Sequence, residues 1–243
     1  MRFREKSIVI LGGTSGIGLA VAREAIDEDA SVCIASKRLE RVEKARAELA
    51  PTDAVHLTTQ TIDVASEAAV KDFFEGIGAF DHLVFTAGDD LPIGSLVDKD
   101  LTDVRARFET RFWGALAAVK HGVRSIRRGG SIVLTSGFSS TRPRPGWTLQ
   151  ASIQSAIEGL TRALAVELAP IRVNAVSPGL ARTPRWNAWT DSARHELYRK
   201  EEQRLPVGRV GEATEIATAY LYLMENSYAT GTVVLADGGG ALV

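Results

Sequence analysis

Short apolar runs alternate with longer stretches of helical period along almost the whole chain. A short continuous apolar run is typical of a strand buried on both faces, whereas apolar residues three or four apart line one face of a helix. Runs of the first kind occur at residues 8–11, 32–35, 55–62, 83–85, 131–134, 171–176 and 232–236. Stretches of the second kind occur at residues 16–28, 39–49, 67–75, 101–125, 153–168 and 212–224.

This alternation predicts βαβ units and an α/β fold, in which a Rossmann-type doubly wound parallel sheet of about seven strands carries helices on both faces. No repeat or linker interrupts the pattern, so we expect a single domain over residues 1–243. The one long irregular stretch, residues 178–211, carries Trp186, Trp189, His195 and Tyr198. Because long loops often cover binding sites, we expect a substrate lid near residues 180–210.

The composition excludes several classes of protein. The 243 residues include 29 Lys and Arg against 30 Asp and Glu, so the formal net charge of −1 offers no field for nucleic acid or an acidic membrane. The one cysteine excludes an internal disulfide framework and is typical of a reducing compartment. The charged start lacks a signal-peptide pattern, and no stretch approaches the roughly 20 apolar residues of a membrane span. We therefore expect a cytoplasmic protein that acts on a small molecule.

The first predicted strand runs directly into a glycine-rich turn, Gly12-Gly13-Thr14-Ser15-Gly16-Ile17-Gly18. Glycines at such a turn let the backbone approach a pyrophosphate, which then lies at the N-terminus of the following helix. A glycine-rich segment by itself is also compatible with an ordinary turn. Its position between a buried strand and a helix favours a dinucleotide site, for which the candidate residues are Gly12, Thr14, Ser15, Gly16, Ile17 and Gly18.

The end of the second predicted strand indicates which dinucleotide binds. A site for an unphosphorylated ribose has Asp or Glu there, whereas this chain has Ser36-Lys37-Arg38. A hydroxyl and two cations would pair with a 2′-phosphate, which a carboxylate would repel. The alternative is that Lys37 and Arg38 only begin a solvated helix. Their position at the end of the strand favours the first interpretation, so we predict NADP(H) rather than NAD(H).

Motifs along nearly the whole chain resemble those of the short-chain dehydrogenase/reductase family. Gly12, Gly16 and Gly18 are similar to its cofactor glycine motif, and Asp63-Val64 is similar to the pair that contacts the adenine. The segment Phe85-Thr86-Ala87-Gly88 keeps the last two residues of the family's Asn-Asn-Ala-Gly. Residues 171–179 resemble the sixth-strand signature, and residues 209–212 and 231–239 the C-terminal signatures. The resemblance implies cofactor contacts from Asp63, Val64, Ala87, Gly88, Gln154, Pro178, Gly179 and Thr183, with Thr183 on the nicotinamide amide.

The catalytic positions of the family are all substituted. Its chemistry uses a Ser that polarises the carbonyl, a Tyr as general acid/base, a Lys four residues after the Tyr, and an Asn that anchors a water. The Tyr and Lys positions fall here on Gln150 and Gln154, the Ser position on Gly137, and the Asn position on Arg111. Glutamine does not ionise, and a missing general acid/base costs about 10²–10⁴ in rate. The resemblance therefore implies cofactor binding, with Gln154 still able to bond the ribose, without the family's ordinary catalysis.

Other residues near these positions leave alternatives open. Ser136 is one position from the serine site, with Thr135, Ser139 and Ser140 beside it, but a shift of one residue would restore neither the Tyr nor the Lys. Tyr198 or His195 could reach the nicotinamide from the lid, or could only line a pocket or face solvent. Arg111 could polarise an oxyanion, or fill the water site through a salt bridge.

The remaining polar and aromatic residues carry weaker signals. His56, His82 and His121 have no metal-ligand spacing, so we expect them to be structural and expect no metal. Cys33 lies in a predicted buried strand and is expected in the core. Trp147, with Arg142 and Arg144, could border a substrate pocket or belong to a surface loop.

Two functions remain open. The first is an NADP(H)-dependent oxidoreductase with a divergent active site, which transfers hydride to or from a small, apolar organic substrate. A protonated imine or an activated double bond would need little acid assistance, although a cationic Arg111 disfavours the imine. The second is a catalytically silent NADP(H)-binding sensor or interaction protein. The resemblance implies a homodimer or homotetramer, assembled through the helices that bear Arg111 and Gln150 and through the C-terminal segment.

Overall fold

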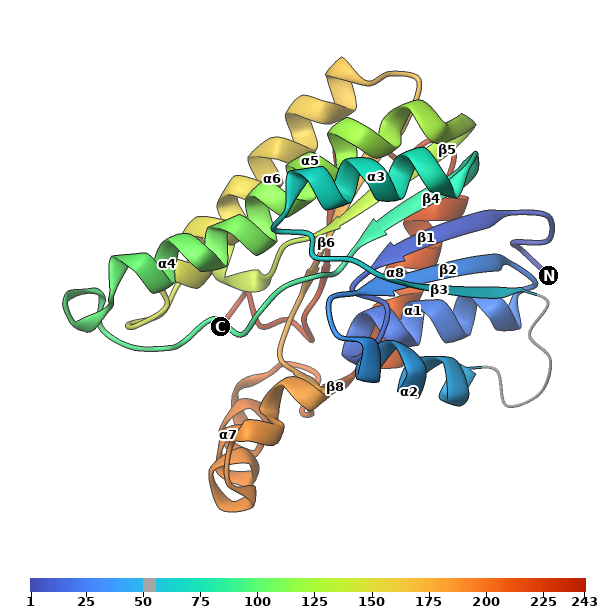
Figure 1. Cartoon of the computed structure of the whole chain (residues 1–243). Coiled ribbons are helices and arrows are strands. Elements are labelled where there is room, and N and C mark those ends of the chain that lie inside the picture. The colour runs from blue at the N-terminus through green and yellow to red at the C-terminus, as the bar shows by residue number, and fades with distance from the viewer. Residues whose placement is uncertain (50–55) are drawn as a thin grey trace.

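A computed structural model describes residues 1–49 and 56–243, and its centre is a seven-stranded parallel sheet (Figure 1). The strand order is β3-β2-β1-β4-β5-β6-β9, and every pair of neighbours is parallel. The predicted fold class is confirmed. The strands of this sheet are β1 (Ser7–Leu11), β2 (Ser31–Ser36), β3 (Leu57–Thr61), β4 (Phe80–Phe85), β5 (Ile126–Thr135), β6 (Arg172–Pro178) and β9 (Val233–Ala236).

Helices cover both faces of the sheet. The α-helices are α1 (Gly16–Asp27), α2 (Leu39–Leu49), α3 (Glu67–Ile77), α4 (Leu101–Phe108), α5 (Gly114–Gly122), α6 (Thr148–Glu167), α7 (Asp191–Arg204) and α8 (Ala213–Glu225). Figure 1 shows α3, α5 and α6 on one side of the sheet, and α1 and α8 on the other. Side chains alternate across a strand, so Val9 and Leu11 of β1 pack towards α3 and α5, whereas Ile8 and Ile10 pack towards α1 and α8. Both faces of β1 are therefore buried, as its unbroken apolar run predicts.

A buried arginine joins the sheet to helix α8. Arg172 of β6 donates from Nη1 to Leu223 O and from Nη2 to Met224 O, each at 2.7 Å. These carbonyls belong to the last turn of α8, where helical partners are missing and a cation is favoured. Asn174, two residues further along β6, donates to Ala229 O at 2.8 Å and accepts from Thr232 N at 3.1 Å. The sixth-strand signature thus holds α8 and the approach to β9 in place.

The predicted elements differ from the structure at two places near the site. The predicted helical region 101–125 is divided into α4, a π-helical turn at Glu109–Trp113, α5 and a short 3-10 turn. The prediction that residues 178–211 are irregular is wrong, because α7 and a 3-10 turn at Pro184–Ala188 lie within them. In α7 only Tyr198 and Glu201 are buried, so this helix lacks the apolar stripe by which a helix is predicted from sequence. The predicted third strand began at Val55, which lies outside the described residues.

Strand β1 lies between β2 and β4, so the chain winds in opposite directions from this point. In an open parallel sheet, ligands bind beyond the carboxyl ends of the strands at such a switch point. Two short strands, β7 (Ala181–Arg182) and β8 (Gly211–Glu212), pair beside it at the base of the segment that carries α7. Over the residues that the structure describes, no helix has the length and apolar character needed to cross a membrane.

His82 and Cys33 are core residues, as the sequence predicts. Cys33 is buried in β2, and burial raises the pKa of its thiol. His82 is buried in β4, with Nδ1 2.9 Å from Ser131 Oγ and its ring 6.0 Å from that of Phe3. Burial lowers the pKa of His82 from 6.5 to about 4, because the protonated ring would lose its hydration.

This buried histidine predicts a loss of stability in acid. Between pH 6.5 and about 4 the unfolded chain takes up a proton on His82 that the folded chain does not, so the free energy of unfolding falls as pH decreases, by up to about 3 kcal/mol. Urea unfolding of the wild type and of His82→Asn between pH 7.5 and 4 measures this term. The variant should lose this part of the pH dependence, whereas His56→Asn, at an exposed histidine, should keep it. An unchanged pH dependence in His82→Asn would contradict the assignment.

Candidate active site

A cavity of about 940 Å³ opens at the carboxyl ends of the central strands. Its wall includes the residues that follow β1, β2, β4 and β5, as expected for a switch-point site. All the residues that the sequence proposed for the cofactor and the catalytic positions line this one cavity. They are Gly12, Thr14, Ser15, Gly16, Ile17, Gly18, Ser36, Lys37, Arg38, Asp63, Val64, Ala87, Gly88, Arg111, Ser136, Gly137, Gln150, Gln154, Pro178, Gly179 and Thr183.

The glycine turn after β1 is shaped by close backbone contacts. Gly12 has a positive φ of 94°, and a Cβ there would lie 2.4 Å from Ala87 N, so no other residue fits without movement. Ser15 caps α1 without a side-chain hydrogen bond, and the first turn of α1 contains no acidic residue. The first N–H groups of α1 are therefore free to bind an anion in the cavity. Thr183 lies across the turn, where a Cβ on Gly16 would come 3.5 Å from the Thr183 Cβ.

Basic side chains line the part of the cavity beyond β2. Lys37 Nζ lies 2.7 Å from Asp63 Oδ2, so Lys37 is already paired within the chain. Hydrogen bonding to Asp63 raises the pKa of Lys37. Burial would raise the pKa of Asp63, but the bonds from Lys37 and from the backbone of Ala65 outweigh it and the pKa is lowered. Arg38 lines the cavity and forms no ion pair within the described part of the chain.

Sequence reasoning missed two further cations here, Arg41 and Lys44 on α2. The signal was present, because Arg38, Arg41 and Lys44 follow one another at intervals of three residues at the start of a helix. Residues three apart lie on neighbouring parts of one helix face. The basic surface beyond β2 is therefore larger than the pair that the sequence singled out.

Two glutamines and a glycine occupy the corner between β5 and α6. Gln150 is 4% exposed and donates from Nε2 to Leu91 O at 2.9 Å. The carboxamide of Gln154 lies against the backbone of Gly137, where a Cβ would come 2.3 Å from Nε2. Any side chain at residue 137 would thus displace the end of Gln154. The Oε1 atoms of Gln150 and Gln154 are buried without a hydrogen-bond partner in the described structure, and each can accept from a ligand.

The hydroxyl of Ser136 is directed at helix α6. Its Oγ lies 2.9 Å from Glu158 Oε1 and 3.2 Å from Gln154 O, and Ser140 also donates to Glu158 Oε1. These bonds tie the end of β5 to α6. Although Ser136 lines the cavity, its hydroxyl already serves this contact and is a poor replacement for the family's serine.

Arg111 projects from the π-helical turn over Gly88. A Cβ on Gly88 would lie 2.5 Å from Arg111 Cζ, so this approach requires glycine. Nε of Arg111 donates to Asp89 O at 3.0 Å, and Nη2 donates to the same oxygen. Of the two alternatives for Arg111, the salt bridge does not form within the described residues, because this partner is a backbone carbonyl. Burial, and then the nearby Arg185, lower the pKa of Arg111 to about 10, so it remains cationic at neutral pH.

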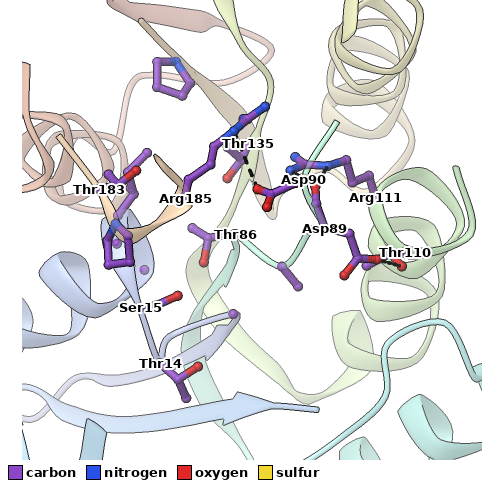
Figure 2. Close-up of a pocket in the computed structure, with 18 of the residues that line it drawn as sticks. Thr14, Ser15, Thr86, Asp89, Asp90, Thr110, Arg111, Thr135, Thr183 and Arg185 are labelled. Carbon is purple, nitrogen blue, oxygen red and sulfur yellow. Dashed lines mark hydrogen bonds and ion pairs between the residues drawn. The ribbon is translucent and has the colours of Figure 1, made fainter. Parts of the chain in front are cut away.

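Arg185, Asp89 and Asp90 also line the cavity, and the sequence gave no local pattern for them. Figure 2 shows the Arg185 and Arg111 side chains approaching Asp90 from different elements, with Thr110 bonded to Asp89. Arg185 Nε lies 3.7 Å from Asp90 Oδ1. Arg107 of α4 lines the same side of the cavity.

The lid candidates Tyr198 and His195 do not line the cavity. Tyr198 is buried against Trp186 and Val210, with the Arg182 guanidinium 4.5 Å above its ring, because it forms the small core between α7 and its base. His195 is exposed on α7. The cavity wall includes no tyrosine, histidine or cysteine among residues 1–49 and 56–243. Trp147 does border it, and the neighbouring Arg144 pairs with Glu201 of α7 at 2.6 Å.

A family model described as enoyl-(acyl carrier protein) reductase matches residues 12–240. The short-chain dehydrogenase/reductase ATR9 of Stachybotrys chlorohalonatus is 36% identical, over 98% of each chain. Two solved structures are similar to this chain. A small-chain dehydrogenase in complex with NADPH is 40% identical, covers 98% of this chain and 99% of its own, and has a TM-score of 0.83. MalC Reductase/Diels-Alderase from Malbranchea aurantiaca is 31% identical, covers 100% of this chain and 98% of its own, and has a TM-score of 0.91.

These matches agree with the doubly wound sheet. They extend over almost the full length of both the chain and its relatives. The chain therefore belongs to the short-chain dehydrogenase/reductase family, whose members are NAD(P)-dependent oxidoreductases.

Proposed function

We propose that the protein is an NADP(H)-dependent oxidoreductase with a divergent active site, which reduces an activated, polarised double bond. The observation that carries the proposal is a cavity wall in which a glutamine, Gln150, stands at the expected position of the proton donor and a cation, Arg111, stands close by. Arg111 enters the cavity at the catalytic end, and the described wall includes no tyrosine or histidine. Such a site suits a reaction in which charge must be stabilised while the proton comes from solvent.

The residues of the cavity fit NADP(H). The free N–H groups at the start of α1 would bind the pyrophosphate, and Arg38 with Lys37 would bind the 2′-phosphate. The buried Gln154 Oε1, which has no partner in the described structure, would accept from a ribose hydroxyl. When bound, NADPH supplies a hydride. The NADPH complex of a relative that is 40% identical supports the choice of this cofactor.

Arg111 would stabilise the negative charge that develops on the substrate. In an α,β-unsaturated carbonyl compound, reduction at the β-carbon moves an electron pair towards the oxygen, and the α-carbon is then protonated from solvent. A guanidinium beside that oxygen donates hydrogen bonds to it without giving up its proton. A ketone would instead need a proton on the nascent alkoxide, which the two glutamines cannot deliver. A protonated imine is disfavoured, because Arg111 and Arg185 would repel it.

A second candidate is the silent NADP(H)-binding sensor or interaction protein. It is favoured by the packing of Gln154 against Gly137, because the space for the family's serine side chain is filled. Turnover separates the two functions. Consumption of NADPH is followed with activated alkenes, imines and ketones, beside a direct NADPH titration. We expect turnover of alkenes alone. Tight NADPH binding with no turnover of any class would favour the sensor, and ketone reduction at the rate typical of the family would refute the divergent site.

The family resemblance also leads us to propose a single NADP(H)-binding domain, with residues 180–210 as a substrate lid, and a homodimer or homotetramer. Exposed apolar side chains on the expected interface helices support the assembly, among them Val166, which is 82% exposed on α6, and Trp113, which is 52% exposed. Sedimentation equilibrium of the purified protein measures the oligomeric state, and a monomer at micromolar concentration would contradict it.

Arg111→Gln should lower kcat on the activated alkene by about 10²–10³, because it removes the charged donor to the developing oxyanion. The wild-type rate should be constant below pH 9 and fall as pH rises through about 10, where Arg111 loses its proton. Steady-state kinetics over pH 6–10.5 measure both effects. Arg105→Gln, at an exposed arginine on α4 outside the cavity, is the matched control and should behave as the wild type. Equal rates for Arg111→Gln and Arg105→Gln would refute the role of Arg111.

Arg38→Ala should raise the Kd for NADPH about tenfold or more and leave the Kd for NADH unchanged, because a charge-assisted bond to the 2′-phosphate is lost. Lys37→Ala should have a smaller effect, since its ammonium is shared with Asp63. Fluorescence titration of both cofactors measures these values. Arg46→Ala, on the helix α2 that follows these two residues but outside the cavity, is the control. An unchanged NADPH affinity in both variants would mean that the cofactor preference has another source.

A further inference from the structure

Two guanidinium groups enter the same end of the cavity from different parts of the chain. Arg111 comes from the π-helical turn before α5, and Arg185 from the 3-10 turn at Pro184–Ala188 (Figure 2). Partial burial lowers the pKa of both groups, and for Arg111 the proximity of Arg185 adds to the effect. Holding two like charges together away from water costs free energy, so a structure that does this calls for a counter-charge.

The chain supplies that counter-charge only in part, because the Asp89 and Asp90 carboxylates lie near Arg111 but neither forms an ion pair with it within the described residues. Arg111 is bonded to the backbone oxygen of Asp89, which has no net charge. Arg185 is paired with Asp90 at 3.7 Å, which is beyond hydrogen-bond distance, and the Asp90 side chain is 67% exposed. An exposed and loosely held pair of this kind contributes little to stability. The Asp90 carboxylate therefore shows where an anion can lie beside Arg185, and a ligand could displace it from there.

Apolar and aromatic side chains also line this cavity. They are Phe138, Trp147, Leu180 and Trp186, and the Arg185 guanidinium lies 5.1 Å from the Trp186 ring centroid. Phe138 and Trp147 pack edge to face with centroids 5.4 Å apart, and together they present an aromatic surface. A ligand that matches both features has an apolar body and one anionic group.

We propose that the substrate is an apolar organic acid whose carboxylate binds the Arg185 guanidinium in place of the Asp90 side chain. This inference deepens the proposed function and rests on it for the identity of the cavity as the substrate site. The carboxylate would accept charge-assisted hydrogen bonds from Arg185, which leaves Arg111 for the oxygen that gains charge during reduction, while the body of the acid lies against Phe138 and Trp147. The expected substrate is then an amphipathic anion and no longer a wholly apolar molecule.

An anion in this cavity has a second source, the phosphates of the cofactor. Arg185 lies two residues after Thr183, which is an expected cofactor contact, so Arg185 could also bind the cofactor. The two sources differ in what Arg185 contributes. If it binds the substrate, its loss changes the preference for an acid over a neutral analogue. If it binds the cofactor, its loss changes the affinity for NADPH alone.

The test is a binding experiment that requires no turnover. Hydrocinnamate and its uncharged amide, hydrocinnamamide, are titrated into the full-length protein with and without saturating NADPH, by isothermal calorimetry. The proteins are wild type, Arg185→Gln, Asp90→Asn, and two controls outside the cavity, Arg199→Gln on α7 and Asp98→Asn. The NADPH affinity of each protein is measured separately. Circular dichroism confirms that each variant folds.

The wild type should bind the acid about tenfold or more tightly than the amide. Arg185→Gln should reduce that ratio to about threefold or less, with its NADPH affinity unchanged. Asp90→Asn should bind the acid about threefold more tightly, because the competing carboxylate is gone. Both controls should match the wild type.

Equal binding of acid and amide by the wild type, or binding of neither, would overturn the proposal. So would a loss of NADPH affinity in Arg185→Gln with the acid-to-amide ratio preserved, which would assign Arg185 to the cofactor. An acid preference that depends on Arg185, in a protein that turns over no alkene, imine or ketone, would refute the proposed activity and leave the anion site standing. The two conclusions can therefore fail separately.

Discussion

The close approach of strands β1 and β4 controls the shape of the site. Gly12, at the end of β1, comes so near Ala87 that a Cβ would lie 2.4 Å from its backbone nitrogen. This contact brings the glycine turn, the start of α1 and the end of β4 around a single space. The strand order also reverses at β1, so the connections that follow β1 and β4 run to opposite sides of the sheet. A cavity of about 940 Å³ lies between them. Every group that we propose to bind cofactor or substrate lies on its wall.

The catalytic end is organised by two glycines that each make room for a longer side chain. Gly137 accommodates the carboxamide of Gln154, and Gly88 accommodates the guanidinium of Arg111. In each case a Cβ would come within 2.5 Å of the longer side chain, so the two members of a pair depend on one another. The residues at the positions predicted to be catalytic therefore form a packed arrangement. Reintroducing a serine at residue 137 alone would require Gln154 to move.

Charge distribution separates the two ends of the cavity. Beyond β2 the cations Lys37, Arg38, Arg41 and Lys44 are largely exposed and suit a phosphate. At the other end Arg111 and Arg185 are less exposed and lie beside aromatic side chains. A nearly neutral chain thus concentrates positive charge at two places in one cavity, with a net charge of only −1 overall. The first place matches a nucleotide, and the second matches the acid that we propose as substrate.

The sequence by itself determined the parallel sheet, most of its helices, and the cavity-lining residues that we propose hold the cofactor. These follow from local patterns, since a buried strand, a glycine turn and an amphipathic helix each leave a signal in consecutive residues. Helix α7 was missed because only Tyr198 and Glu201 are buried in it, so it lacks an apolar stripe. Only the tertiary structure decided that Tyr198 is packed into the base of α7, that Lys37 is paired with Asp63, and that Arg185 faces Arg111. The physical reason is that these contacts join residues from separate elements, whose relative positions depend on the packing of the whole fold.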